Sequence, residues 1–61
     1  MNRINIARNS LRALFGVRQY DITRTGEIHV HGLMPNTNMV GWYLYGQMGS
    51  IETLHRLGAI T

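Results

Sequence analysis

Two histidines separated by one residue are the first side chains in this chain that could carry chemistry. His29 and His31 flank Val30, and in an extended segment both imidazoles project from the same side. Such a pair could chelate one metal ion, although protein zinc sites use three or four ligands. The remaining histidine, His55, falls on a helix that we expect on the opposite, apolar side of the sheet. We therefore predict no metal site and no cofactor.

Groups suited to catalysis are scattered along the chain. It has no cysteine, no glycine-rich phosphate loop and no paired acids at a useful spacing. Ser10 and Ser50 stand in no recognisable motif. Asp21 could orient His29 as a base, but any two-stranded sheet can place such a pair side by side. These observations favour a protein that is not an enzyme.

The positive charge is carried by arginine alone. The six cations give a net charge of +3 and are all arginines, and the sequence pI is near 10.2. A guanidinium matches phosphate and carboxylate groups and stacks on bases, so an anionic partner is one explanation. A genome whose codon usage prefers arginine over lysine, or a plain solvated face, is the other.

The histidines belong to a predicted β-hairpin. Tyr20–Thr23 and Glu27–His31 both alternate apolar with polar residues, the period-2 pattern of half-buried strands. The three-residue connection between them ends in Gly26. It suits a type I turn followed by a residue in the left-handed region, which glycine enters without a Cβ penalty.

The turn also predicts the register of the hairpin. Ile22 then faces Ile28 on an apolar side, and Asp21 faces His29 on a polar side that also carries His31. A slip of one residue would mix the two sides, so the turn and the alternation support the same pairing.

A third strand is predicted over 40–45, where aromatic residues are concentrated. We expect Val40, Trp42 and Leu44 to join the core and Tyr43 and Tyr45 to point outward beside the histidines. The opposite assignment stays open, because both sides of this strand carry bulky groups.

A helix is expected on each side of the strands. The first carries an apolar stripe and ends at Gly16; the second begins at the N-cap Ser50 and ends near Leu57. The stripe of the first helix consists of Ile4, Ala7, Leu11 and Leu14, and that of the second of Ile51, Leu54 and Leu57. The predicted fold is α+β, a single domain over 1–61 with the order helix, three antiparallel strands, helix (αβββα).

Size limits what this chain can bury. A domain of 61 residues buries only about 60% of its unfolded surface. Without cysteine no disulfide can add stability, so we expect self-association into a homo-oligomer. No apolar run approaches the ~20 residues that cross a bilayer, and no signal peptide is recognised. We expect no membrane association and a cytoplasmic location.

The segment 20–57 is similar in topology to two families of nucleic-acid-binding domains. Trp42-Tyr43-Leu44-Tyr45-Gly46 leading into Ser50-Ile51-Glu52 resembles the third strand and following helix of AP2-type and integrase arm-binding domains. The full element order resembles a double-stranded-RNA-binding domain. The arginine-dense strands of the first family and the lysine-rich helix of the second are missing, so no residue roles are carried over.

Two functions follow as hypotheses. The first is a small basic nucleic-acid-binding protein, a phage- or plasmid-type regulator that prefers DNA to RNA and uses the outer sheet face plus arginines. The second is a modulator that docks on a host protein, whose interface would draw on the same tyrosines, histidines and arginines. The candidate binding residues are Arg8, Arg12, Arg18, Arg24, His29, His31, Tyr43 and Tyr45.

Overall fold

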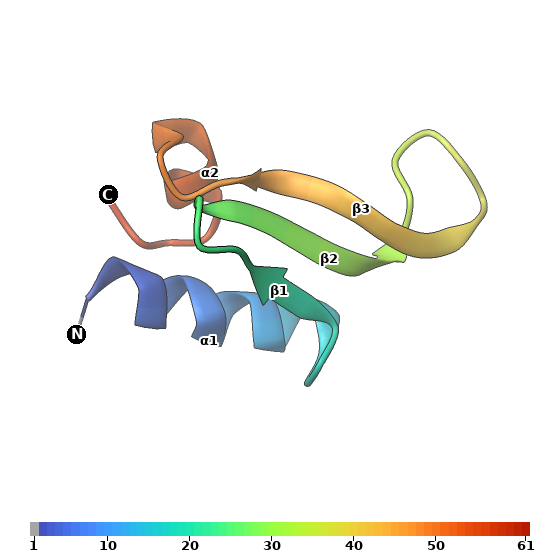
Figure 1. The fold of residues 1–61 in the computed structure, drawn as a ribbon, viewed down its shortest axis with the longest axis horizontal. Helices are drawn as coiled ribbons and strands as arrows, with labels where there is room; N and C mark the ends of the chain where they lie inside the picture. The colour runs from blue at the N-terminus through green and yellow to red at the C-terminus, as the bar shows by residue number, and fades with distance from the viewer. Residues whose placement is uncertain (1) are drawn as a thin grey trace.

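The computed structural model describes residues 2–61 as two helices and one antiparallel sheet (Figure 1). The elements in chain order are α1 (Arg3–Phe15), β1 (Tyr20–Ile22), β2 (Glu27–Leu33), β3 (Val40–Gln47) and α2 (Ile51–Arg56). The three strands lie in the order β1-β2-β3. The predicted α+β class and the order αβββα are confirmed. Neither helix in 2–61 is long and apolar enough to cross a membrane.

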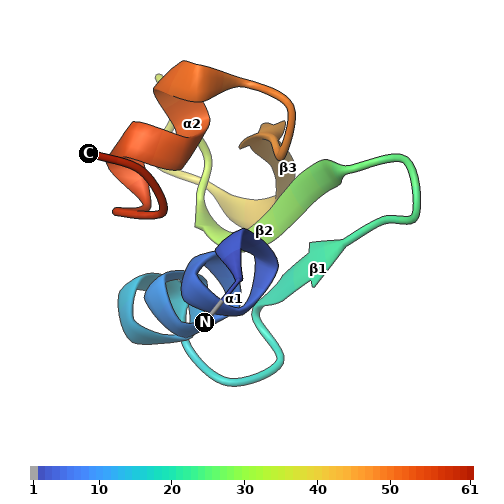
Figure 2. The ribbon, with the colours of Figure 1, turned by 90° about the vertical axis from the view of Figure 1, so that its left-hand side faces the viewer.

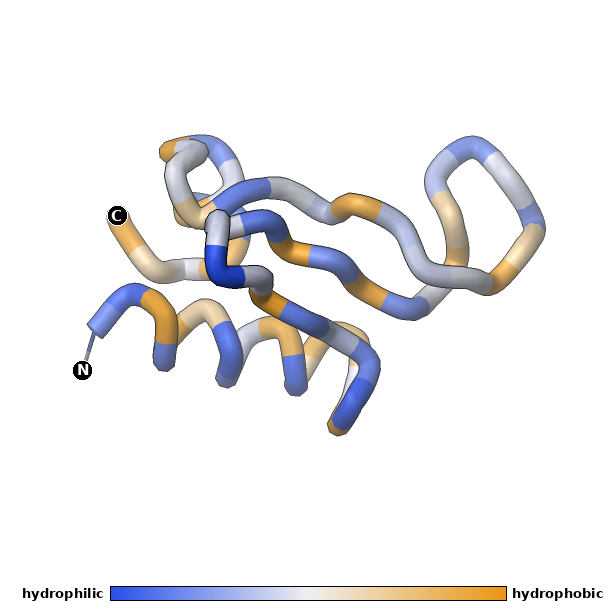
Figure 3. Tube along the Cα trace, in the orientation of Figure 1, coloured by the Kyte–Doolittle hydropathy of each residue, from blue (hydrophilic) through white to orange (hydrophobic). Residues whose placement is uncertain are grey.

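Helix α1 presents its apolar side to the sheet. The Asn2 side chain caps its start by accepting from the Asn5 N–H at 2.9 Å. Gly16 ends it at a φ of 117° and donates its N–H to the Arg12 carbonyl. Figure 3 shows hydrophilic residues along the side of α1 that faces away from the sheet. Leu14, predicted in the inward stripe, is exposed, and the Phe15 ring packs against the core instead.

The first hairpin forms as predicted. Gly26 adopts a φ of 91° and donates its N–H to the Thr23 carbonyl at 3.0 Å, closing the turn. Thr23 in turn donates its N–H to the Glu27 carbonyl at 2.9 Å. The pairs between β1 and β2 are Tyr20 with Val30, Asp21 with His29 and Ile22 with Ile28.

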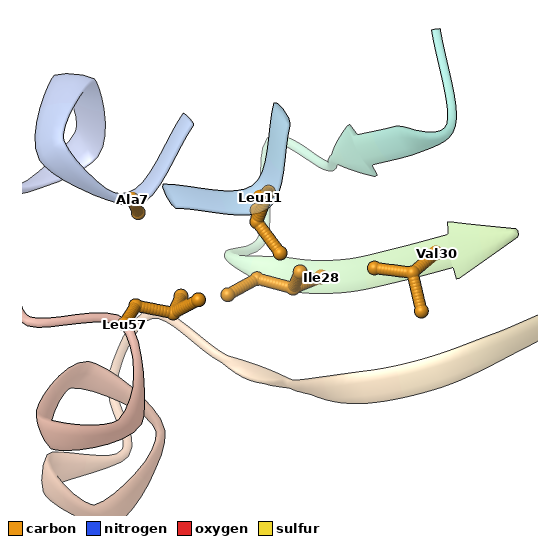
Figure 4. Close-up of a cluster of buried hydrophobic side chains, with 5 residues drawn as sticks. All are labelled: Ala7, Leu11, Ile28, Val30 and Leu57. Atoms are coloured by element: carbon orange, nitrogen blue, oxygen red, sulfur yellow. The ribbon is translucent and has the colours of Figure 1, made fainter. Parts of the chain in front are cut away.

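The core lies between the sheet and both helices. Figure 2 shows α1 and α2 on the same side of the sheet. The buried cluster combines Ala7 and Leu11 of α1 with Ile28 and Val30 of β2, and Leu57 closes it from the end of α2 (Figure 4). Because the chain has no third layer, the other side of the sheet is left without cover.

Helix α2 packs through a threonine. Ser50 caps its start by accepting from the Thr53 N–H. The N–H groups of Gly58 and Ala59 then close its end on carbonyls of the last turn, in the Schellman pattern. Thr53, Leu54 and Leu57 are buried, whereas Ile51, predicted to be inward, is exposed. An added Cβ at Gly46 would overlap the Thr53 side chain, so this close approach turns Thr53 inward in place of Ile51.

Strand β3 faces the opposite way from the prediction. Its pairs with β2 include His31 with Trp42 and His29 with Leu44, so Trp42 and Leu44 share the histidine side of the sheet. The cause is the connection: the six residues 34–39 separate the pair Leu33 and Val40. Since partners in a sheet share a face, this register sends every second β3 residue outward.

The tyrosines occupy the inner side that Trp42 was expected to fill. The rings of Tyr45 and Phe15 meet edge to face, with centroids 5.5 Å apart and planes at 80°. The Arg56 guanidinium lies 5.1 Å from the Tyr45 ring centroid. Tyr45 is also the extra residue of a bulge, because Leu44 pairs with His29 and Gly46 pairs with Ile28. Tyr43 packs against the core as well.

Two glycines face each other near the far end of the second hairpin. Gly32 of β2 pairs with Gly41 of β3. The Phe15 ring fills part of the space beside them, 3.4 Å from where a Gly32 Cβ would lie. Met34 covers Gly41 in the same way. Beyond this pair, the loop 34–39 projects past the end of α1 (Figure 1).

Candidate binding surface

The uncovered side of the sheet carries an apolar surface. We call it the open face; it consists of His29, His31 and Leu33 of β2 and Val40, Trp42 and Leu44 of β3. Its large apolar side chains are far from buried: the exposed fractions are 61% for Leu33, 66% for Val40, 52% for Trp42 and 53% for Leu44. Apolar groups clustered in this way mark interaction sites in soluble proteins.

The histidines lie among these apolar groups. His31 pairs with Trp42 across the strands, and their ring centroids are 5.4 Å apart with planes at 56°. His29 Nε2 lies 3.2 Å from Glu27 Oε1, so a ring N–H can donate to that carboxylate. Asp21 stands opposite His29 in the register, but the side-chain contact is made by Glu27 of the same strand.

The open face does not have the features of a small-molecule or metal site. Within residues 2–61 no three side chains of His, Asp or Glu come together as a ligand set. The same part of the chain encloses no pocket. A ligand of this face would have to lie on its surface.

Charge is absent from the β3 half of the sheet. Between Glu27 and Glu52 the sequence contains no Asp, Glu, Lys or Arg. This interval includes nearly all of β2, the whole of β3 and the loop that joins them. Because desolvating charged groups opposes association, an uncharged surface favours contact with another uncharged surface.

The arginines lie elsewhere. Arg8 and Arg12 are exposed on α1, which packs on the covered side of the sheet, and Arg12 Nη2 donates to Asn9 Oδ1 at 3.4 Å. Arg18 lies between α1 and β1 with a φ of 63°, and Arg24 lies in the turn of the first hairpin. In residues 2–61 the one ion pair is that of His29 with Glu27, so no carboxylate neutralises these arginines.

The candidate residues taken from the sequence therefore divide into three groups. His29 and His31 lie on the open face, as expected. Tyr43 and Tyr45, expected beside them, are on the inner side against the core. The candidate arginines, Arg8, Arg12, Arg18 and Arg24, are all exposed, but the two on α1 are separated from the histidines by the sheet itself.

Sequence reasoning missed the apolar part of this surface. Leu33 was not considered, and Val40, Trp42 and Leu44 were assigned to the core because they share one side of their strand. The interval without charge from Glu27 to Glu52 is visible in the sequence. It could have indicated that β3 has no polar side to turn to water.

Comparison with known proteins identifies no relative. No family model, curated protein or solved structure matches this chain.

Proposed function

We propose that this chain is a non-enzymatic binding protein that docks on another protein through its open face. The observation that carries the proposal is the exposure of Leu33, Val40, Trp42 and Leu44 together on a side of the sheet that no helix covers. The partner surface would be apolar and uncharged, as the open face is. The protein would act as a modulator, by occupying that surface on a host protein.

The composition of the face supports this proposal. Interface centres are depleted in charge and enriched in aromatic residues, and tryptophan is among the residues most often found to dominate binding energy. Trp42 lies between Val40 and Leu44 on the edge strand and against His31 on the neighbouring strand. It is thus surrounded by side chains that could exclude water around it in a complex.

The test compares two leucines of matched exposure. Leu33 is 61% exposed on the open face, and Leu14 is 62% exposed on α1. The parent, Leu33→Ser and Leu14→Ser would each be immobilised and exposed to nuclease-treated host lysate. We expect a protein retained by the parent and by Leu14→Ser, and retained at least about tenfold less by Leu33→Ser.

Fluorescence of Trp42 provides a direct readout, because it is the single tryptophan of the chain. Addition of the retained protein, with its own tryptophans replaced, should shift the Trp42 emission to shorter wavelength as the indole leaves water. Equal retention by both leucine variants, or an unchanged emission in the complex, would contradict docking through the open face.

Nucleic-acid binding is a second candidate, favoured by the distribution of charge. Four arginines and no acid precede Asp21 in the sequence. Arg8 and Arg12 lie one turn apart and exposed on α1. Arginines without carboxylate partners suit contacts to phosphate, which position a protein on a duplex without reading its sequence. The surface proposed for this function is α1 rather than the sheet.

A salt titration with a fluorescent DNA duplex tests this candidate. The logarithm of the affinity should fall with the logarithm of salt concentration at a slope of about −0.9 per phosphate neutralised. Arg8→Ala with Arg12→Ala should reduce that slope by about two units, while Arg24→Ala should leave it nearly unchanged. No binding at low salt, or an equal loss from Arg24→Ala, would contradict binding through α1.

A further inference from the structure

Strand β3 has an unpaired edge whose hydrogen-bonding groups can be identified. The His31 N–H donates to the Gln19 carbonyl of the segment leading into β1, and the Met34 N–H donates to the Met39 carbonyl across the second hairpin. Backbone groups alternate in direction along a strand. The groups of Gly41 and Tyr43 therefore point at β2, and those of Val40, Trp42 and Leu44 point away from the sheet.

No element covers this part of the edge. β3 is the last strand in the sheet order, and Val40–Leu44 lies at its end away from α2 (Figure 1). Proteins protect exposed edges with charged residues, proline or very short strands. β3 has eight residues and contains neither a charge nor a proline, so it is open to pairing with another strand.

We propose that two copies of this chain pair through β3, antiparallel, with Trp42 on the two-fold axis. The sheet would then run continuously in the order β1-β2-β3-β3-β2-β1. Helices of both copies would lie on one side, and the two open faces would join on the other.

This register is the one that uses all the outward backbone groups. With Trp42 opposite Trp42 of the second copy, Val40 stands opposite Leu44 in both directions. Each of these pairs exchanges two hydrogen bonds, and a shift by two residues would leave Leu44 or Val40 without its counterpart. A shift by one residue would bring outward groups against inward ones, so it would make none of these bonds.

The side chains agree with the same register. On the open face it brings Trp42 against Trp42 and Val40 against Leu44, pairs of the kind that stabilise sheets. On the inner face it places Tyr43 opposite Gly41, whose missing side chain leaves room for the ring. The absence of charge between Glu27 and Glu52 means that no like charges meet at the joint.

The dimer goes beyond docking on a host protein and does not depend on it. Pairing uses the edge of β3, whereas docking uses the face, including Leu33 of β2. Dimerisation is measured on the purified protein without a partner, so the two proposals can fail separately.

Sedimentation equilibrium of the purified chain over a range of concentrations tests for pairing. We expect the mass to rise from the 7.0 kDa of the monomer toward twice that value. Trp42→Lys places like charges opposite each other at the two-fold axis and should weaken dimerisation about tenfold or more. Trp42→Glu should do the same, and an equimolar mixture of the two variants should recover dimers in which each contains one of each chain.

A second pair of variants tests the neighbouring positions of the register. Val40→Lys with Leu44→Glu in one chain brings opposite charges together twice and should dimerise more tightly than Val40→Lys with Leu44→Lys. The control, Leu33→Lys, adds a charge to the open face away from the edge and should leave dimerisation within about threefold of the parent. Circular dichroism of each variant separates lost pairing from lost folding.

The proposal is overturned by a parent chain that stays monomeric at every concentration. A dimer that is unaffected by Trp42→Lys also overturns it, as does a lysine–glutamate mixture that dimerises no better than its components. In those cases the chains would meet elsewhere or not at all.

Discussion

The two faces of the sheet carry similar side chains in opposite environments. On the inner face, Ile28 and Val30 are fully buried beneath α1 and α2. On the open face, Leu44 and Trp42 remain about half exposed, although they belong to the same sheet. The comparison teaches that folding accounts for only one of the two apolar surfaces. The second surface adds little to the stability of the single chain, and we infer that it serves contacts with other molecules.

A matched pair of aliphatic substitutions should show the largest difference between the faces. Ile28→Ala should lower the free energy of unfolding by about 2–5 kcal/mol, since it empties space that surrounding side chains cannot refill. Leu44→Ala should change it by less than about 0.5 kcal/mol, because little burial is lost. Urea unfolding at concentrations where the chain is monomeric measures both. Similar losses would mean that the open face contributes to the fold after all.

Contact between β3 and α2 sharpens the comparison on the inner side. Gly46→Ala would place a Cβ against the Oγ1 and Cγ2 atoms of Thr53, and should cost about 1–3 kcal/mol through overpacking. The control is Gly49→Ala, where an added Cβ meets nothing within 4 Å. Thermal unfolding of the two variants should separate them clearly, and equal melting temperatures would contradict the close approach of α2.

The turn of the first hairpin should respond more weakly. Gly26 has a φ of 91°, which an alanine side chain adopts only with strain, while the nearest atom to its added Cβ is an ordinary 3.7 Å away. Gly26→Ala should therefore cost about 1 kcal/mol from backbone strain alone. Urea unfolding measures this cost, and Gly49→Ala again provides the control. An unchanged midpoint would show that the turn tolerates another backbone conformation.

Trp42 should give the smallest effect on stability. Trp42→Ser should shift the free energy of unfolding of the monomer by less than about 0.5 kcal/mol. In the parent, acrylamide should quench the indole emission of the folded monomer efficiently, because half of the side chain is already in water. A loss of several kcal/mol, or protection from the quencher in the monomer, would place the indole in the core.

The two hairpins explain how much of this structure can be predicted from sequence. In the first, Gly26 determines the turn, and the alternation of apolar and polar residues in β2 agrees with it, so both the pairing and the faces were predicted correctly. The caps Asn2 and Ser50 and the closing Gly16 likewise act through local backbone chemistry. Local signals of this kind were sufficient for the fold class.

The second hairpin lacks such signals. Val40, Trp42 and Leu44 compete with Tyr43 and Tyr45 for the core, and both sets are bulky. The choice depends on the six-residue loop and on the edge-to-face contact of Tyr45 with Phe15, which joins residues thirty positions apart in the sequence. The composition of the candidate surface was wrong for this reason, while its histidines, positioned by the first hairpin, were placed correctly.

The facing pair Gly32 and Gly41 has a consequence for recognition. With no Cβ on either strand at this level, the sheet can change its local twist at little steric cost. Leu33 and Val40, which lie just beyond the pair, can therefore tilt relative to Trp42 and Leu44 without disturbing the buried cluster. A surface articulated in this way can follow partners of different curvature, so a chain too small to enclose a ligand could still adapt its contour to one.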